Sequence, residues 1–417
     1  MKKIIQNKLI PFAIIVFIVL GCSEKYNFES NTYEEAFVVE ATITNELKIQ
    51  EVKLTKTYRL ESLVPTIETG ASVYVSDNLG NQYSFLENAG TYKSVNPFQA
   101  ISGRSYQLHF TTSNGKSYES TPEQTPTATL LQDVVPEVVT KDGVRGVQIS
   151  AKSFDATNTS KYYRYEYEET YKIIAPKWSP YKAVVTGPEE MIITPRITEV
   201  KTCYKTDLST NIILTETNGQ SEDRVDYPVR FISNQNYIIS YRYTILLKQY
   251  VQNLDSRNYY RTLKQISETG NSILSQTQPG FLIGNLKSIN DPKERVVGFF
   301  DVSSVSSKRI YFNYSKLFPS EPLPPYYTDC SDETPLKPSI KRSFNYNFAC
   351  GLDDIPVCEG YQILEEIRAN QLVYVNGSSR INFPVGIPAI LYLFPTPCGD
   401  CTSFNNNSNI KPTFWID

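Results

Sequence analysis

Histidine is almost absent from this chain of 417 residues, which carries only one. That residue, His109, lies in Gln107-Leu108-His109-Phe110, where strand alternation places it with the polar Gln107 and away from its apolar neighbours. We interpret it as a solvated strand residue. The sequence also has no Gly-x-Ser-x-Gly elbow, no phosphate-binding glycine loop and no zinc-protease helix motif. We therefore predict that the protein is not an enzyme and has neither a catalytic residue nor a cofactor.

An excess of one charge is also missing. The 41 basic side chains nearly balance the 44 acidic ones, which leaves a net charge of −3 at pH 7. No block of like charge occurs, whereas proteins that bind phosphate backbones need a basic surface. We predict no nucleic-acid partner.

Adjacent carboxylates occur as Glu168-Glu169, Glu189-Glu190 and Asp353-Asp354. Neighbouring residues on a strand point to opposite faces, so adjacency does not indicate the paired acids of a glycosidase. Other acids lie near cysteines without the spacing of the regular calcium loop: Asp329, Asp332, Glu333, Asp353 and Asp354. We interpret these as solvated turn residues and predict no metal site.

Long apolar runs are confined to the start of the chain. Three early lysines precede the run from Pro11 to Leu20, which is too short to span a bilayer and is typical of a secretory signal. The run ends at Val19-Leu20-Gly21-Cys22, which resembles a bacterial lipobox. We expect residues 1–21 to be removed and Cys22 to carry the lipid, palmitate included, since two or more acyl chains give stable attachment. The alternative is an ordinary signal peptide with an incidental cysteine.

The residues after Cys22 bear on which side of the membrane the protein occupies. Glu24 in Ser23-Glu24-Lys25 is a weak version of the acidic stretch that sends some lipoproteins to the outer face. We expect an outer-membrane lipoprotein exposed at the cell surface, with a periplasm-facing anchor as the alternative. Residues 22–36 form the predicted tether.

The remaining cysteines indicate disulfides in an exported chain. Six lie beyond Cys22, so up to three bridges are possible: Cys203, Cys330, Cys350, Cys358, Cys398 and Cys401. Five of them follow residue 329, which predicts a loop-rich extension over 318–417. We expect it to pack on the second domain and to be held by bridges, because its own core is small. Cys398-x-x-Cys401 also has a spacing that zinc sites use, but an oxidising compartment favours disulfides.

The composition is typical of a mainly β protein, because 30 tyrosines and 20 phenylalanines suit half-buried pleated surfaces. Alternating strands are predicted over 37–43, 105–111 and 116–120, with a hairpin turn at Ser113-Asn114-Gly115. A further hairpin turns at 77–81. We predict a sandwich over 37–120 and a proline-marked linker over 121–129.

A second sandwich is predicted over 130–317. Its central strands are 162–173, where tyrosines alternate with charged residues, and 237–250. A helix is expected around 256–273, with Ser256 as its N-cap, and strands near 282–286, 296–302 and 309–314 complete this sheet pair. The predicted fold is thus two immunoglobulin-like or fibronectin-III-like β-sandwiches, one inserted helix and the disulfide-rich C-terminal extension.

Exposed aromatic residues are the candidates for ligand contact. Inward tyrosines are expected to pack in the cores, whereas Trp178, Tyr326 and Tyr327 lie in predicted loops. These three side chains suit stacking against a sugar ring.

Several short motifs occur in a characteristic order: Phe37-Val38-Val39-Glu40-Ala41, residues 69–77, Gly103-Arg104-Ser105-Tyr106, Gly284-Asn285-Leu286, Val297-Gly298-Phe299-Phe300 and Cys398-Gly399-Asp400-Cys401. Together with the lipobox they resemble the Bacteroidetes lipoproteins grouped as domain of unknown function 4249. Asn405-Asn406-Asn407 stands where those proteins usually have a glycine pair, so this loop is expected to differ.

The resemblance implies a surface partner or lid of a TonB-dependent β-barrel receptor in the outer membrane, and it brings no catalytic residues. Our leading hypothesis is an accessory that contributes to ligand capture or gating. One alternative is a structural subunit of an outer-membrane assembly or secretion complex. A further alternative is a surface glycan-binding protein.

Overall fold

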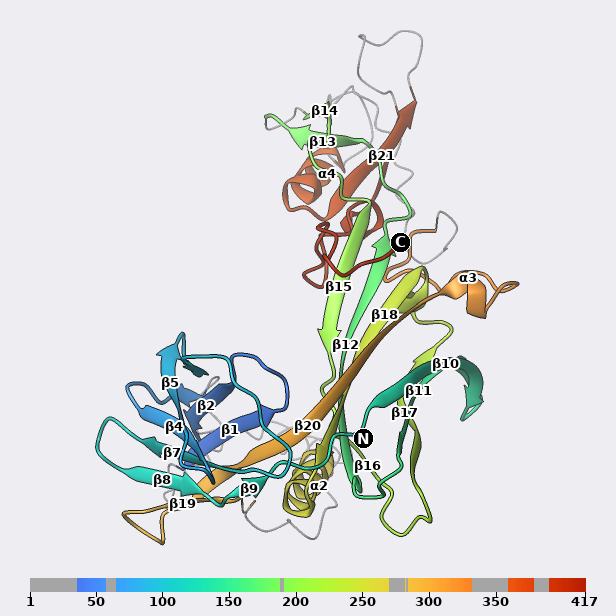
Figure 1. Ribbon diagram of the computed structural model, residues 1–417. Helices are drawn as coiled ribbons and strands as arrows, with labels where there is room; N and C mark the ends of the chain where they lie inside the picture. Colours follow the sequence, from blue (N-terminus) through green and yellow to red (C-terminus); the bar gives the residue numbers. More distant parts are fainter. Residues whose placement is uncertain are drawn as a thin grey trace, which may run out of the picture.

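The computed structural model describes residues 36–57, 65–187, 191–269, 282, 284–331, 359–378 and 390–417. Most of them lie in strands, as the composition predicts, and these strands form four sheets within the described ranges. Two β bodies stand side by side and share one long strand (Figure 1). No helix in these ranges is both long enough and apolar enough to cross a membrane.

The N-terminal body is a curled, largely antiparallel sheet around a single core. Valines, phenylalanines and tyrosines fill this core because they alternate along each strand, as in the predicted strands near 37–43 and 105–111. The strands are β1 (Phe37–Thr44), β2 (Glu51–Lys56), β3 (Thr66–Ile67), β4 (Ser72–Asp77), β5 (Gln82–Asn88), β6 (Thr91–Ser94), β7 (Ser105–Thr111), β8 (Ser117–Ser120), β9 (Glu123–Gln124) and β19 (Leu286–Ser288).

The second body packs a three-stranded sheet against the far half of the large one, and both contribute to one core. The three-stranded sheet contains β10 (Leu131–Lys141), β11 (Val144–Asp155) and β17 (Asp223–Ser233). Its partner contains β12 (Tyr162–Ile174), β15 (Thr202–Leu208), β16 (Ile213–Glu216) and β18 (Arg242–Gln252). The alternation predicted for β12 is confirmed, since Tyr163, Tyr165 and Tyr171 are buried in this core.

One strand, β20 (Val296–Asn313), corrects the predicted sheet assignment. The sequence predicts separate strands at 296–302 and 309–314 that complete the second sheet pair. Instead they form a single strand, whose first half pairs in parallel with β1 and whose second half pairs with β18. Val296, Phe300 and Val302 therefore pack in the N-terminal core, and β19 beside β8 belongs to that body as well. A short apolar run does not reveal which sheet it will join.

The strand predicted from Tyr237 begins five residues later, at Arg242. Tyr237–Ile239 is a 3₁₀ turn (η1), because the side chain of Asn236 accepts a hydrogen bond from the Ile238 N–H and caps it. Local capping overrides the period-2 pattern here.

Helix α2 spans Leu254–Thr269 and confirms the predicted helix within the described residues. Its cap is Asn253, whose Oδ1 accepts from the Ser256 N–H at 2.8 Å, so the prediction of Ser256 as N-cap is wrong. The Ser256 side chain is buried and donates to Asp301 instead, at 2.8 Å.

The C-terminal part contains more regular structure than the predicted loop-rich extension. Five residues form a small core between this region and a hairpin of the second body: Met191, Leu364, Leu372, Tyr374 and Leu393. The hairpin consists of β13 (Tyr181–Val185) and β14 (Met191–Pro195). The remaining elements are α3 (Tyr314–Leu317), α4 (Glu359–Arg368), β21 (Leu372–Ser378), β22 (Ile390–Pro395) and α5 (Thr396–Gly399).

Two asparagines in the last loop adopt a backbone conformation that glycine usually provides. Asn405 and Asn406 both have a φ of 53°, the left-handed conformation that glycine adopts most easily. Asparagine is the side chain that tolerates this region best after glycine. The loop therefore keeps a backbone shape that a glycine pair would also allow.

Candidate binding site around helix α2

The cysteines pair across long stretches of sequence. Cys203 of β15 is bonded to Cys401, and Cys330 is bonded to Cys398. The two cysteines of the Cys-x-x-Cys motif therefore belong to different disulfides. A cysteine in a disulfide has no thiolate, so neither residue can bind zinc in this state. The other two disulfide candidates, Cys350 and Cys358, and the lipid-anchor candidate Cys22 lie outside the described residues.

The three aromatic ligand candidates lie around α5. Tyr326 donates to the Pro397 carbonyl at 2.9 Å, and the backbone N–H of Lys177, next to Trp178, donates to the Cys398 carbonyl at 2.8 Å. Trp178 and Tyr326 are half-buried against the second core. Tyr327 is 47% exposed, although it stacks on Phe404 with ring centroids 4.3 Å apart. Trp178 and Tyr326 thus have packing roles, and Tyr327 has the most accessible ring.

His109 lies on the outer face of β7, as alternation predicts, but it is more sheltered than expected. Its ring stacks on Tyr74 at 4.7 Å, and its Nε2 is 3.0 Å from the Ser76 hydroxyl. Burial lowers the pKa of His109 below its usual 6.5, while the nearby Glu119 opposes the shift.

The adjacent acids of β12 point to opposite faces, as predicted. Glu168 accepts from Arg309 at 2.8 Å, whereas Glu169 binds Arg230 and accepts from the Tyr243 hydroxyl at 2.6 Å on the core side. The pairs Glu189-Glu190 and Asp353-Asp354, together with Asp332 and Glu333, lie outside the described residues.

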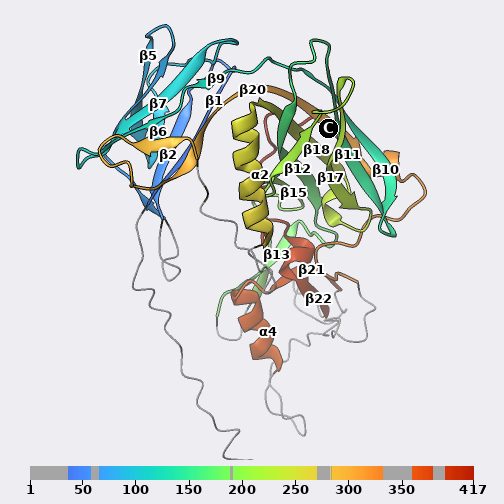
Figure 2. The ribbon, with the colours of Figure 1, turned by 90° about the horizontal axis from the view of Figure 1, so that it is seen from below.

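Helix α2 occupies the space between the two bodies on the outer face of the large sheet (Figure 2). It contacts both β12 and β20. Tyr259 packs on Phe299 of β20, with ring centroids 5.2 Å apart. The helix covers the face of β12 that carries charged residues in the alternating pattern.

Arg164 of β12 lies beneath this helix and is 6% exposed. Its guanidinium lies between two phenol rings, 4.2 Å from the centroid of Tyr250 and 4.5 Å from that of Tyr260. It also donates to Glu166 and lies 3.8 Å from Asp301. Cation–π contacts and two carboxylates together replace the water that this charge loses on burial.

Asp301 connects this cluster to the start of the helix. It is fully buried and accepts from Ser256 at 2.8 Å and from Ser303 at 2.7 Å. Burial by itself lowers the pKa of Arg164, but Tyr260, Glu166 and Asp301 outweigh it and the net shift is upward. The guanidinium stays charged, and its cation–π contact with Tyr260 of α2 links the helix to the sheet.

Two cavities flank α2, and together we call them the α2 groove. The first, of about 390 Å³, lies between the helix, β12 and residues 208–212. The second, of about 660 Å³, lies between the helix, β1 and residues 48–51 of the N-terminal body. Arg164, Glu166, Tyr260 and Leu263 line both. Guanidinium, carboxylate and phenol groups in an open groove suit the binding and orientation of a polar partner.

Sequence reasoning missed this groove, because it places Arg164 only on the charged face of its strand, opposite the tyrosines. Alternation correctly separates the charged positions of β12 from the tyrosines, but it does not show what covers the charged face. The helix pattern itself could have indicated this cover. Tyr259 and Leu263 recur at helical spacing, and such an apolar stripe needs a surface to pack on.

A family model described as Domain of unknown function (DUF4249) matches residues 23–309. No curated protein matches the chain. Among solved structures, trypsin-activated alpha-2-macroglobulin from Escherichia coli is 7% identical with a TM-score of 0.16, and the match covers 54% of this chain and 15% of that one.

Two domains of a biofilm associated protein also match. The BSP domain is 8% identical with a TM-score of 0.16 and coverages of 71% and 62%. The B domain is 8% identical with a TM-score of 0.12 and coverages of 66% and 85%. This chain therefore spans less than two thirds of the first two structures, and likenesses this low carry no argument about function.

Proposed function

The chain belongs to the family of the Domain of unknown function (DUF4249), and we propose that it is a non-enzymatic outer-membrane lipoprotein that works beside a TonB-dependent receptor in ligand capture or gating. The observation that carries the proposal is the lipobox Val19-Leu20-Gly21-Cys22, which ends where the family match begins. A lipid on Cys22 would anchor the two bodies at the membrane surface, next to outer-membrane receptors.

The junction between the bodies supports a role as a partner or lid. Glu123 of the predicted linker is 4% exposed and accepts from Asn253 at 2.6 Å and from Asn285 at 2.8 Å. The linker is thus bonded to both bodies, and β20 runs through both sheets. Elements fixed in this way can present the α2 groove to a receptor in one orientation.

We interpret the two bodies as sandwiches of the immunoglobulin or fibronectin III type, over the predicted ranges 37–120 and 130–317. Two separate hydrophobic cores, one in each body, support this interpretation.

Lipid attachment is tested by labelling cells with palmitate and fractionating membranes. The parent protein should carry label and sediment with outer membranes, whereas Cys22→Ser should lose both properties. Ser23→Ala is the matched control and should behave as the parent. An unlabelled parent that fractionates like Cys22→Ser contradicts the anchor.

The partnership is tested by copurification in mild detergent. A TonB-dependent receptor should be recovered with the parent and less of it with Leu263→Arg, which places a charge in the α2 groove. Leu79→Arg is the control, because Leu79 is 65% exposed in the turn between β4 and β5. Absence of any receptor from the parent preparation would count against the proposal.

A further inference from the structure

A smaller cavity, of about 350 Å³, opens where the two bodies meet at the start of α2. We call it the junction pocket. The N-terminal body contributes Ser102 and Gly103, and the linker contributes residues 124–127. The second body contributes Thr159, Lys161 and Gln252. Both bodies therefore line one site.

Two residues that line this pocket each have a buried side-chain oxygen without a hydrogen-bond partner among the described residues. The oxygens are Oγ1 of Thr125 and Oε1 of Gln252, and the two residues are 3% and 2% exposed. Leaving such groups unpaired costs roughly 1–3 kcal/mol each, so both oxygens would gain from a hydrogen-bonding partner.

The orientation of the Gln252 amide follows from its neighbours. The Ser256 hydroxyl gives its proton to Asp301 at 2.8 Å, so it accepts from the Gln252 Nε2 at 2.7 Å. The carbonyl oxygen Oε1 is therefore the end left without a partner. It needs a donor, and an anionic oxygen placed there would be repelled.

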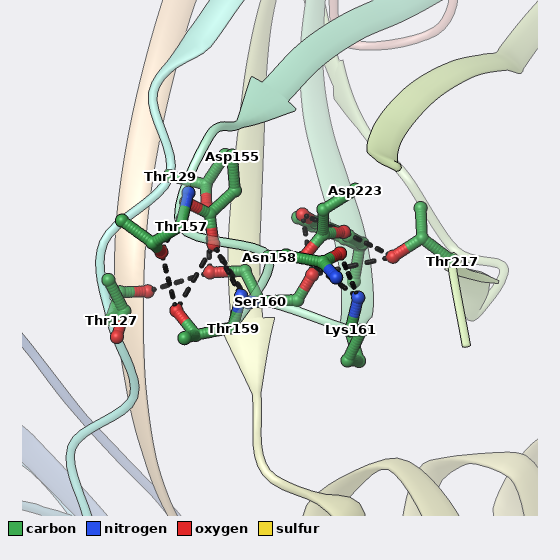
Figure 3. A network of polar contacts seen from close by, with 11 residues as sticks. Thr127, Thr129, Asp155, Thr157, Asn158, Thr159, Ser160, Lys161, Thr217 and Asp223 are labelled. Atoms are coloured by element: carbon green, nitrogen blue, oxygen red, sulfur yellow. Dashed lines mark hydrogen bonds and ion pairs between the residues drawn. The ribbon is translucent and has the colours of Figure 1, made fainter. Parts of the chain in front are cut away.

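The segment 155–161, which contributes Thr159 and Lys161 to the pocket, is fixed by its own hydrogen bonds (Figure 3). Asp155 accepts from the backbone N–H groups of Thr157, Thr159 and Ser160 at 2.9 to 3.0 Å. The hydroxyl of Ser160 is hydrogen-bonded to Thr129 of the linker at 2.7 Å. The pocket is thus preformed on this side and does not depend on a ligand for its shape.

The charge of the pocket is compensated. Lys161 donates to Asn158, and its Nζ lies 3.7 Å from Oδ2 of the buried Asp223 (Figure 3). The other lining residues are hydroxyl, amide, glycine, proline, leucine and tyrosine side chains. A net anion would meet the Gln252 carbonyl and a cation would meet Lys161, so the chemistry favours a neutral ligand.

We propose that the junction pocket binds a neutral, hydroxyl-rich ligand, of the class of an uncharged sugar unit. A hydroxyl group both donates and accepts, so neighbouring sugar hydroxyls satisfy the Gln252 carbonyl and the Thr125 hydroxyl together. The volume lies at the lower end of small-molecule sites, roughly 300–1,000 Å³, which suits one or two sugar rings. A peptide strand would need a longer open edge.

The junction pocket contains none of the aromatic residues that the sequence suggests for sugar contact, which are Trp178, Tyr326 and Tyr327. Its place in nutrient uptake rests on the proposed function, but binding itself needs neither lipid nor receptor. A chain that binds sugar without being acylated would refute the anchor alone, and an acylated chain that binds no sugar would refute the pocket alone.

The test measures binding of glucose, galactose, mannose and N-acetylglucosamine to the full chain in mild detergent, by saturation-transfer NMR and calorimetry. Glucuronate and glucosamine provide rings with a negative and a positive charge. At least one neutral sugar should bind, and it should bind more tightly than its charged counterparts.

Thr125→Val is the decisive variant, because it keeps the shape of the side chain and removes a hydroxyl that has no partner in the described part of the chain. It should fold as the parent does and bind the sugar about three- to tenfold more weakly. Thr396→Val is the matched control, since Thr396 Oγ1 is also buried without a partner among the described residues but lies in α5. It should bind as the parent does.

Three outcomes would overturn the proposal. One is no binding of any neutral sugar at millimolar concentration. Another is unchanged affinity in Thr125→Val, and the third is tighter binding of glucuronate than of every neutral sugar.

Discussion

Replacing Asn285 by alanine should loosen the seam between the curled N-terminal sheet and β20. Oδ1 of Asn285 accepts from the Phe300 N–H at 2.8 Å, and Nδ2 donates to the Phe300 carbonyl at 2.9 Å. The same Nδ2 donates to Glu123 at 2.8 Å. The side-chain amide thus takes the place of a neighbouring strand for one residue of β20.

The expected loss follows from what is left unpaired. Phe300 is fully buried, so its N–H and carbonyl would each lose a partner at a cost of roughly 1–3 kcal/mol. Glu123 retains its bonds from Thr121 and Asn253, so its share is small. Because Asn285 is half-exposed, water replaces part of the loss, and we expect about 2–4 kcal/mol in total.

Urea unfolding followed by tyrosine fluorescence and circular dichroism measures this change. The transition midpoint should fall while its slope is kept, which indicates lost stability in an unchanged fold. Asn218→Ala, at an exposed turn residue, should stay within about 0.5 kcal/mol of the parent. If Asn285→Ala is no more destabilised than Asn218→Ala, the seam does not depend on this amide and the reasoning is wrong.

Three further predictions concern backbone strain and titration. Gly298→Ala should lower the free energy of unfolding, measured by thermal unfolding, by about 2–5 kcal/mol, because φ is +122° and a Cβ would lie 2.1 Å from the Val39 carbonyl oxygen. Gly80→Ala is the control, and it should lower this free energy by about 1–2 kcal/mol, because the space around Gly80 is open. Burial raises the pKa of Asp155, but hydrogen bonds led by Thr157 outweigh it and the net pKa lies below 3.8, so its stabilisation is complete above that value. The stability difference between the parent and Asp155→Asn, from urea titrations, should therefore be full at neutral pH and shrink as the pH falls below about 4. The single His109 should titrate in NMR with a midpoint below 6.5, and a midpoint above it would contradict the burial of its ring.

Local features of the fold could be predicted from the sequence because their causes are local. The turn at 77–81 forms since Asp77 accepts from the N–H groups of Leu79 and Asn81 and Gly80 takes a positive φ. The alternation of β12 places its tyrosines in the core for an equally local reason. Residue order alone suffices for such elements.

Long-range features could not be predicted in this way. The parallel pairing of β1 with β20 and the choice of Cys401 for Cys203 depend on which segments meet in space. The same limit applies to the candidate site, because Arg164 is buried only once α2 covers it. The pattern of a single sequence shows which face of a strand or helix each residue occupies, but it does not show which distant residues pack against that face.

The parallel pairing of β1 with β20 also determines the order in which the chain can mature during synthesis. Phe37–Thr44 emerges first, yet its partner Val296–Ser303 follows only after the strands of the second body. The N-terminal core stays open until then, because Val296, Phe300 and Val302 belong to it. A fragment ending at residue 120 should therefore expose apolar surface and aggregate, and a nascent chain needs protection until β20 arrives.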